Sequence, residues 1–490
     1  MRLTTKRLLA VLLVVLLGTT ALLRLVLGFI FFGFHTGDDV EILQAGFRRA
    51  LGWPYQPWDI RNLFLSDVLV APVIRLAALL GVTSTRTLVW LAGVPFALLA
   101  SLNAWLVFQL ARRWLGRDGP ALLAAGLYAC HWIPLGYGST VYPRTASTAC
   151  ILLAAWLLAE AEGGLRRPAL AGGLAAVAFA VRYSEAIFLL PLLAALCLEA
   201  QGSVQSSIRQ RAARCAALLG GFAAACLLTV GVEDWLTWGK PFASLAAFAK
   251  FTLVERRSSS LVPSQPWFWY FRRLPKWLPV TLLPLLWRAR RVRGALPVAL
   301  YGVLPLLVLS AIHQKQLRYL QGVIPFLILL AAAGAWSFWE DGKRLRVVLL
   351  CALSLALGLR GLHFLSQKSM AAASAAERLS VFRGQTVALS QSWAYGGTLY
   401  LRHEITVLDL PYPLTEQALE STLPQAGWAA VYAEDLRDHP AIPLFFRRHG
   451  FTEVARIHWG ESKPVVLYRG RPLQAAPPSS RPVFPPALSQ

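Results

Sequence analysis

The chain has 490 residues, of which 56% are hydrophobic and only 15% charged, and its mean hydropathy is +0.52. A soluble protein of this length could not cover so much apolar surface, so the composition excludes an ordinary soluble fold. The formal net charge of +23 would suit nucleic-acid binding. However, the basic residues fall in short clusters at every second connection between apolar blocks, which is the positive-inside pattern of membrane proteins. Orientation in the bilayer therefore explains the charge, and no nucleic-acid partner is expected.

The apolar blocks predict an all-α polytopic membrane protein. A helix needs about 20 mostly apolar residues to cross the hydrocarbon core. We expect eleven spans, near residues 8–33, 87–111, 120–136, 144–160, 169–182, 185–200, 215–232, 277–287, 295–312, 319–338 and 347–365. The first is too long for a typical signal peptide, so we expect it to be retained. Three spans are short, so the number of spans can change by two and still be odd. With an odd number of spans and a cytoplasmic N-terminus, the C-terminal region lies outside.

Two large outer loops interrupt the expected membrane domain, residues 1–365. The first, 34–86, holds a cluster of acids and an amphipathic stretch from Leu63 to Leu80 that suits an interfacial or further helix. The second, 233–276, is rich in aromatic residues that favour the headgroup zone. All six cysteines lie in or beside apolar blocks without metal-ligand spacing, so we expect neither disulfides nor a metal site.

After residue 365 the composition changes and predicts a small α/β domain, residues 366–471, outside the membrane. Short strands are expected at Thr386–Ser390, Ile405–Asp409, Ala429–Tyr432 and Val465–Tyr468. Helices are expected near Thr415–Leu423 and Pro443–His449. The last stretch, 472–490, is rich in Pro and Ser and is predicted to be disordered.

The first candidate site is the acidic segment that follows the first span. Asp38, Asp39 and Glu41 fall within four residues, shortly after His35. Neighbouring acids repel one another, which raises at least one pKa and favours a general base that takes a proton from an acceptor hydroxyl. The alternative is structural, because Asp38 or Asp39 would cap a helix running from Val40 to Ala50.

The second candidate site is a basic outer connection, His313-Gln-Lys-Gln-Leu-Arg318. The positive-inside rule would leave this connection uncharged. His313, Lys315 and Arg318 could bind a lipid phosphate and stabilise it as a leaving group. Anchoring to headgroups is the alternative.

Smaller signals lie at membrane depth or in the outer loops. Arg144 begins the fourth expected span, and Arg182 and Glu185 interrupt a long apolar run. Ionisable groups at such positions face a cavity or one another, and Arg182 with Glu185 also suits a structural pair at i, i+3. Asp234 opens the second large loop.

The order of these motifs resembles the GT-C membrane glycosyltransferases, particularly the mannosyltransferases of glycosyltransferase family 22 that build glycosylphosphatidylinositol anchors and N-glycans. His35 with Asp38 and Asp39 resembles the family's His-x-Asp-Glu motif, although the histidine stands one residue further away. Trp58-Asp59 and Arg61 resemble its Trp-Glu and Arg-Ser elements.

The resemblance continues through the rest of the membrane domain. Tyr142-Pro-Arg-Thr145 is similar to a Pro-Arg-Thr segment, and Asp234 with Trp238-Gly239 is similar to an Asp-x-x-x-aromatic-Gly segment. His313, Lys315 and Arg318-Tyr319, ahead of Pro325, resemble a His-Lys-Glu-x-Arg-Phe motif, with one extra residue and without the acid. The resemblance ends near residue 340 and does not cover the C-terminal domain.

The resemblance implies a GT-C fold and an inverting transfer of a sugar from a polyprenyl-phosphate donor, such as a phosphomannose lipid, to a glycan or lipid-linked acceptor at the outer face. Asp38, preferred over Asp39, would act as base, and His313, Lys315 and Arg318 would hold the departing phosphate. The expected substrate-binding residues are His35, Glu41, Trp58, Asp59, Arg61, Arg144, Arg182 and Asp234. The scheme requires neither a cofactor nor a metal. A multi-pass transporter or lipid flippase is the rival hypothesis, and a non-catalytic scaffold is a third.

Overall fold

A computed structural model describes residues 2–159, 164–199, 208–255, 264–401, 404–410 and 414–470 of the chain. The expected disordered tail, 472–490, lies outside these residues. The chain divides into two compact units. Unit 1 comprises residues 1–27, 59–65 and 93–362, and unit 2 comprises residues 28–58, 66–92 and 363–490. Most of the first large loop therefore groups with the C-terminal region, whereas the sequence had suggested a boundary near residue 365 alone.

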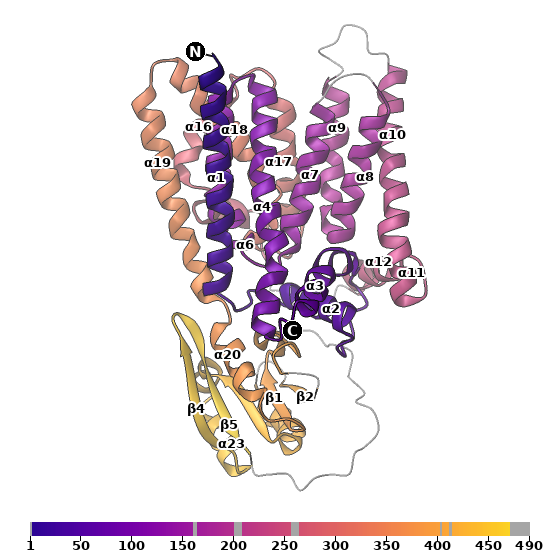
Figure 1. Cartoon of the computed structure of the whole chain (residues 1–490), viewed down its shortest axis with the longest axis vertical. Helices are drawn as coiled ribbons and strands as arrows, with labels where there is room; N and C mark the ends of the chain where they lie inside the picture. Colours follow the sequence, from indigo (N-terminus) through magenta and orange to yellow (C-terminus); the bar gives the residue numbers. More distant parts are fainter. Residues whose placement is uncertain are drawn as a thin grey trace. The chain divides into compact units, whose positions relative to one another are not determined.

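Unit 1 is helical. Its elements, with α1 and α4 extending into unit 2, are α1 (Arg2–Ile30), α4 (Thr85–Leu115), α5 (Asp118–Ala129), α6 (Trp132–Tyr137), α7 (Pro143–Ala159), α8 (Arg166–Val181), η2 (Tyr183–Phe188), α9 (Leu189–Glu199), α10 (Ile208–Cys226), η3 (Leu227–Gly231), α11 (Val232–Trp238), α12 (Ala243–Ala249), η4 (Lys250–Val254), α14 (Trp269–Arg272), α15 (Leu274–Trp277), η5 (Val280–Leu282), α16 (Leu283–Ala289), α17 (Ala295–Ala311), η6 (Leu317–Leu320), α18 (Ile324–Glu340) and α19 (Arg344–Arg360). Figure 1 labels most of them; η marks short 3₁₀ or π segments.

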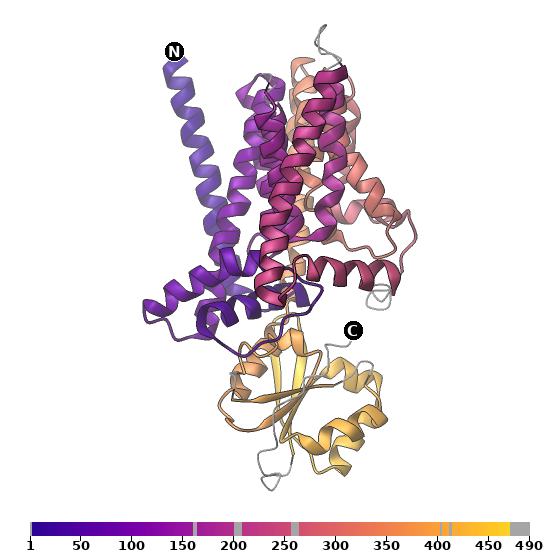
Figure 2. The same cartoon turned by 90° about the vertical axis from the view of Figure 1, so that its right-hand side faces the viewer.

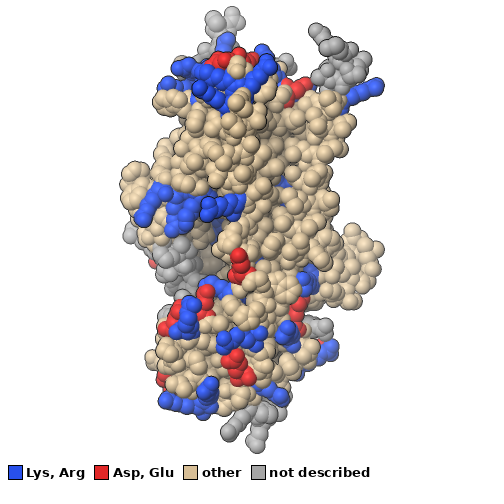
Figure 3. Space-filling view, turned by 90° about the vertical axis from the view of Figure 1, so that its left-hand side faces the viewer, with Lys and Arg blue, Asp and Glu red and all other residues tan. Residues whose placement is uncertain are grey.

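Each of the eleven expected spans coincides with a helical segment, but the number of spans stays a prediction. Among the described residues, four helices are long and apolar enough to cross a membrane: Arg7–Ile30, Thr85–Leu115, Ile208–Trp238 and Arg344–Leu379. The other apolar helices are shorter. The third expected span is broken, since α5 ends at Ala129 and α6 begins at Trp132. The surface agrees with a membrane protein, because Figure 3 shows basic side chains at the top of the helical unit and a second basic patch lower down, with a largely uncharged band between them.

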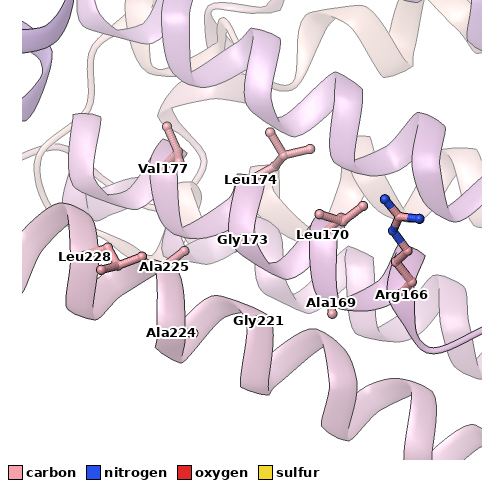
Figure 4. A pocket seen from close by; sticks show the side chains of 10 residues that line it. All are labelled: Arg166, Ala169, Leu170, Gly173, Leu174, Val177, Gly221, Ala224, Ala225 and Leu228. Atoms are coloured by element: carbon pink, nitrogen blue, oxygen red, sulfur yellow. The ribbon is translucent and has the colours of Figure 1, made fainter.

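Small residues let α8 and α10 pack closely. A Cβ added to Gly221 would lie 2.0 Å from the carbonyl oxygen of Ala169, and one added to Gly172 would lie 1.9 Å from that of Leu218. Beside this contact the two helices form an open groove of about 480 Å³, whose lining is apolar except for Arg166 at one end (Figure 4). The groove contains none of the candidate site residues.

Unit 2 contains a mixed sheet. Its elements are α2 (Gly37–Leu51), η1 (Ser66–Val70), α3 (Ala71–Leu79), η7 (Gly361–Gln367), which begins in unit 1, α20 (Met370–Leu379), β1 (Thr386–Ser390), η8 (Ser392–Tyr395), β2 (Thr406–Leu410), α21 (Glu416–Thr422), η9 (Leu423–Gln425), β3 (Trp428–Tyr432), α22 (Ala433–Asp438), α23 (Ala441–Arg448), β4 (Thr452–Trp459) and β5 (Ser462–Arg469). The strand order is β2-β1-β3-β5-β4, with β1 parallel to β2 and β3, and β5 antiparallel to β3 and β4.

The expected α/β composition of this region is confirmed. All four predicted strands exist, and both predicted helices correspond to α21 and α23. The prediction missed the edge strand β4, most of whose residues are exposed, so it lacks the apolar run that marked the others. The amphipathic stretch of the first loop forms η1 and α3. Alternate residues of the sheet pack with α21–α23 in one core, while α20 packs against β4 and β5 (Figure 2).

Candidate functional site

The acidic segment opens α2 in unit 2. The helix begins at Gly37 with Thr36 as its N-cap residue, so Asp38 and Asp39 both lie in the first turn. The interpretation of either acid as the N-cap is therefore wrong, because the helix starts earlier than the apolar pattern indicated. Asp39 is 2% exposed and Asp38 is 9% exposed. The Asp39 carboxylate accepts hydrogen bonds from the His35 backbone N–H (3.3 Å) and the Thr36 hydroxyl (3.0 Å).

A segment far along the chain packs on this acidic turn within the same unit. The His35 ring stacks on Phe364 with ring centroids 4.5 Å apart. The backbone N–H of Phe34 donates to Ser369 Oγ, and the Ser369 N–H donates back to the Phe34 carbonyl, each at 3.0 Å. Lys368 is 1% exposed, and its ammonium donates to the carbonyl oxygen of Phe31 at 2.7 Å.

Glu41 also has a local role, because its carboxylate accepts the backbone N–H of Trp58 at 2.9 Å and so ties the middle of the first loop to α2. Asp59 is exposed and Arg61 is half-buried, and both belong to the short piece of that loop that groups with unit 1.

Three candidate arginines meet around one aromatic ring in unit 1. The guanidinium carbons of Arg144, Arg182 and Arg318 lie 4.8, 5.8 and 5.8 Å from the ring centroid of Tyr319. These arginines come from the start of α7, the break between α8 and η2, and η6. The sequence had identified Arg144 and Arg182 separately from Arg318, and the fold brings them together. We call these three arginines with Tyr319 and Glu185 the arginine cluster.

Glu185 is the anionic member of the cluster. It forms a buried ion pair with Arg144, both side chains being at most 2% exposed. The expected i, i+3 pair with Arg182 is wrong in its partner: the chain leaves α8 in an extended conformation at Arg182, which breaks helical spacing. Arg182 adds a weaker attraction to Glu185. Arg144 also donates to Ser184 Oγ at 3.0 Å and to the Tyr319 carbonyl at 3.4 Å.

Asp234 forms a separate buried polar network. Its carboxylate accepts hydrogen bonds from Asn62 Nδ2 (3.0 Å), the Ser244 N–H (2.9 Å) and the Ser244 hydroxyl (2.7 Å). Ser244 Oγ also lies 2.5 Å from the hydroxyl of Tyr183. Tyr183 precedes Ser184 and Glu185, so one tetrapeptide from Arg182 contacts both this network and the arginine cluster. With these contacts made inside the protein, Asp234 has a clear structural function.

The basic connection does not act as one cationic group. Lys315 is 3% exposed, and its ammonium donates to the backbone carbonyls of Gln265, at 3.1 Å, and Ile312. Burial lowers the pKa of Lys315. His313 is exposed, with Nδ1 3.4 Å from the hydroxyl of Ser264. Of the three residues expected to hold a phosphate, only Arg318 joins the arginine cluster.

Sequence reasoning missed several residues of these groups as site candidates. They are Tyr183, Ser184, Ser244 and Lys368, whereas Glu185 and Tyr319 were named within motifs but given no role in the site. There was reason in the sequence to consider Glu185 and Tyr319, because Tyr319 follows Arg318 and Glu185 lies three residues after Arg182. Lys368 offered no such reason, because its partner is more than 300 positions away.

The apolar helices of unit 1 define an integral membrane protein, and its arginine cluster joins the buried Arg144 and Glu185 to the partly exposed Arg182 and Arg318. The chain belongs to the Alg9-like mannosyltransferase family, whose profile matches residues 49–390. This confirms the resemblance to glycosyltransferase family 22 and gives no support to a transporter or flippase. The match begins after Asp38 and Asp39, so their roles rest on other grounds.

One curated relative and two solved structures extend the comparison. The chain is 26% identical over 334 residues to GPI mannosyltransferase 3 of Yarrowia lipolytica, a match that covers 66% of this chain and 61% of that protein. It resembles ArnT from Cupriavidus metallidurans bound to undecaprenyl phosphate, with a TM-score of 0.63 at 14% identity, over 93% of this chain and 97% of ArnT. It also resembles the archaeal oligosaccharyltransferase AglB from Archaeoglobus fulgidus in complex with an inhibitory peptide and a dolichol-phosphate, with a TM-score of 0.56 at 12% identity, over 90% and 72% of the chains. These likenesses support a fold of the GT-C type.

Proposed function

We propose that the protein is an inverting glycosyltransferase that moves a sugar, mannose in the first instance, from a polyprenyl-phosphate carrier to an acceptor hydroxyl. The arginine cluster carries this proposal. Three guanidinium groups converge on one aromatic ring, and of these Arg144 pairs with Glu185, so positive charge is concentrated where a phosphate would bind. Arginine suits this task because its planar fork donates two parallel hydrogen bonds to phosphate oxygens. Family membership and the two polyprenyl-phosphate-bound structural relatives support the same donor class.

In the proposed reaction the acceptor oxygen attacks the anomeric carbon from the face opposite the phosphate. The bond from the anomeric carbon to the phosphate oxygen breaks, and the polyprenyl phosphate leaves with the bonding electron pair. The hydroxyl proton passes to a carboxylate of the acidic turn, with Asp38 as the preferred base. The arginine cluster stabilises the charge that accumulates on the phosphate. The expectation that no metal or cofactor takes part stays a prediction.

We place the reaction at the outer face of the membrane, with a glycan or a lipid-linked glycan as acceptor. The basic clusters at alternate connections support a cytoplasmic N-terminus. With an odd number of spans, the acidic turn after α1 and the C-terminal domain then share the outer side. Labelling of single introduced cysteines from each side of the membrane tests this orientation.

The central test replaces Arg182 and Arg318, separately, by Gln. The assay measures binding of polyprenyl phosphate to the purified protein and transfer of labelled mannose from polyprenyl-phosphate mannose. Each variant should lose about tenfold or more in affinity, since a hydrogen bond to a charged group contributes about 1.5–3 kcal/mol and 1.4 kcal/mol is tenfold. Arg290→Gln is the matched control, because Arg290 also lies over an aromatic ring, that of Trp287 at 3.7 Å, outside the cluster. Wild-type binding in both cluster variants would contradict the phosphate site.

A further inference from the structure

Asp234 anchors a chain of hydroxyl groups that ends beside the arginine cluster. Asp234 and Ser244 are both fully buried, and the Ser244 hydroxyl donates to the carboxylate at 2.7 Å. A serine hydroxyl has one hydrogen to donate, so the Tyr183 hydroxyl, 2.5 Å from Ser244 Oγ, must donate to it. Donation therefore runs from Tyr183 in η2 through Ser244 to an ionised carboxylate that can only accept.

The backbone before Ser244 is strained in a way that presents it to Asp234. Phe242, the N-cap residue of α12, has a φ of 57°, a left-handed conformation that is unfavourable for a bulky side chain. The turn brings the Ser244 N–H to the carboxylate as well, at 2.9 Å. The Phe242 ring packs so closely on Gly231 that an added Cβ there would lie 3.1 Å from it. Strain of this kind persists only where the surrounding contacts determine it, so the fold holds Ser244 in place.

Tyr183 is the member of its tetrapeptide that contacts this buried network. Its neighbours Ser184 and Glu185 both bind Arg144 within the arginine cluster. Arg182, which directly precedes Tyr183, is extended with a φ of −159°, and its guanidinium carbon lies 5.8 Å from the centroid of the aromatic ring in the cluster. The hydrogen bond of Tyr183 therefore holds the backbone immediately after Arg182.

We propose that Asp234 is a positioning residue of the phosphate site: through Ser244 and Tyr183 it holds Arg182 where that arginine receives the phosphate of the polyprenyl donor. This inference rests on the proposed function and deepens it. Asp234 was expected from the sequence to bind substrate, and it acts instead through the arginine. Breaking the chain of hydroxyl groups should therefore weaken phosphate binding without removing any group that touches the donor.

The test measures binding of polyprenyl phosphate to the full-length purified protein carrying Tyr183→Phe. This change removes only the hydroxyl and keeps the ring, whose centroid lies 4.9 Å from that of Phe179 and 5.2 Å from that of Phe248. Ser244→Ala breaks the same chain one step further on. We expect each variant to bind about three- to tenfold more weakly, which is the loss that one hydrogen bond between neutral groups can cause.

Ser354→Ala is the matched control. Ser354 is also buried, and its Oγ lies 2.6 Å from the hydroxyl of Thr281, so this change breaks a similar pair of hydroxyl groups outside the network. It should bind polyprenyl phosphate as the wild type does. If Ser244→Ala shows no melting transition, Tyr183→Phe decides, because it leaves the contacts between Ser244 and Asp234 intact.

An Arg182→Gln background separates positioning from a general loss of structure. In that background Tyr183→Phe should change the affinity by less than about twofold, because the arginine through which it acts is gone. The same loss with and without Arg182, or wild-type binding by Tyr183→Phe, would overturn the positioning role. Wild-type binding by both Arg182→Gln and Arg318→Gln would instead remove the phosphate site, and with it the observation that carries the proposed function.

Discussion

Replacing Glu185 by Gln would leave the buried Arg144 guanidinium without its anionic partner. The side chains of Arg144 and Glu185 are 2% and 1% exposed, so water cannot solvate the guanidinium once the carboxylate is gone. Breaking a buried ion pair from one side costs about 3–5 kcal/mol, and the neutral hydrogen bond that Gln can still accept returns about 1 kcal/mol. We therefore expect the free energy of unfolding to fall by about 2–4 kcal/mol. Tryptophan fluorescence during unfolding with SDS in mixed micelles measures this change.

The matched control is Glu340→Gln, which neutralises an exposed ion pair in the same unit. Arg117 Nη1 lies 3.1 Å from Glu340 Oε1, and the two side chains are 60% and 48% exposed. Exposed pairs contribute about 0–1 kcal/mol, so this variant should unfold almost as the wild type does. If Glu185→Gln were no less stable than Glu340→Gln, the ion pair at the centre of the arginine cluster would not exist as described.

Two further predictions concern packing and pH. Gly221→Ala should destabilise the protein strongly, because the new methyl group would lie 2.0 Å from the carbonyl oxygen of Ala169. Gly220→Ala is the control and should be tolerated, because a Cβ at Gly220 would meet nothing within 4 Å. Equal melting temperatures of the two variants would contradict the close approach of α8 and α10. Burial raises the pKa of Asp435 from its ordinary 3.8, so the wild type should lose stability as the pH rises through that pKa. Asp435→Asn should therefore raise the melting temperature at pH 7 and have little effect near pH 3, and an equal effect at both would contradict this.

Hydropathy predicted the helical elements well because each helix in a bilayer must be apolar along its own length. Three of the four strands found from sequence, β1, β3 and β5, are largely buried apolar runs, and the fourth, β2, lies at an edge but is still mostly apolar in sequence. Strand β4 was missed because it is an edge strand whose side chains mostly face solvent, so pairing with β5, and not composition, defines it. The grouping of residues 28–58 with the C-terminal region was also beyond sequence reasoning, since it depends on contacts between distant segments.

The candidate site shows the same division between local and distant information. The sequence identified Arg144, Arg182 and Arg318 as unusual, because a charged side chain near membrane depth is costly unless it faces a cavity or a partner. It grouped Arg318 with Lys315 by proximity along the chain, but the extended segment before η6 turns Lys315 toward the carbonyls of Gln265 and Ile312. Only the fold could place Arg318 beside arginines from α7 and the start of η2.

The charge of the arginine cluster matches the change in charge during the proposed transfer. A polyprenyl-phosphate sugar is a phosphodiester with one negative charge, whereas the released monoester carries about 1.5–2 at neutral pH. Under the proposed function, the three guanidinium groups together outweigh the single charge of Glu185, so the cluster would attract the departing phosphate more strongly than the bound donor. Catalysis requires this preference. Without Glu185 the cluster would carry one more positive charge and would bind the product more tightly, so under the proposed function the buried carboxylate both stabilises Arg144 and favours release of the polyprenyl phosphate.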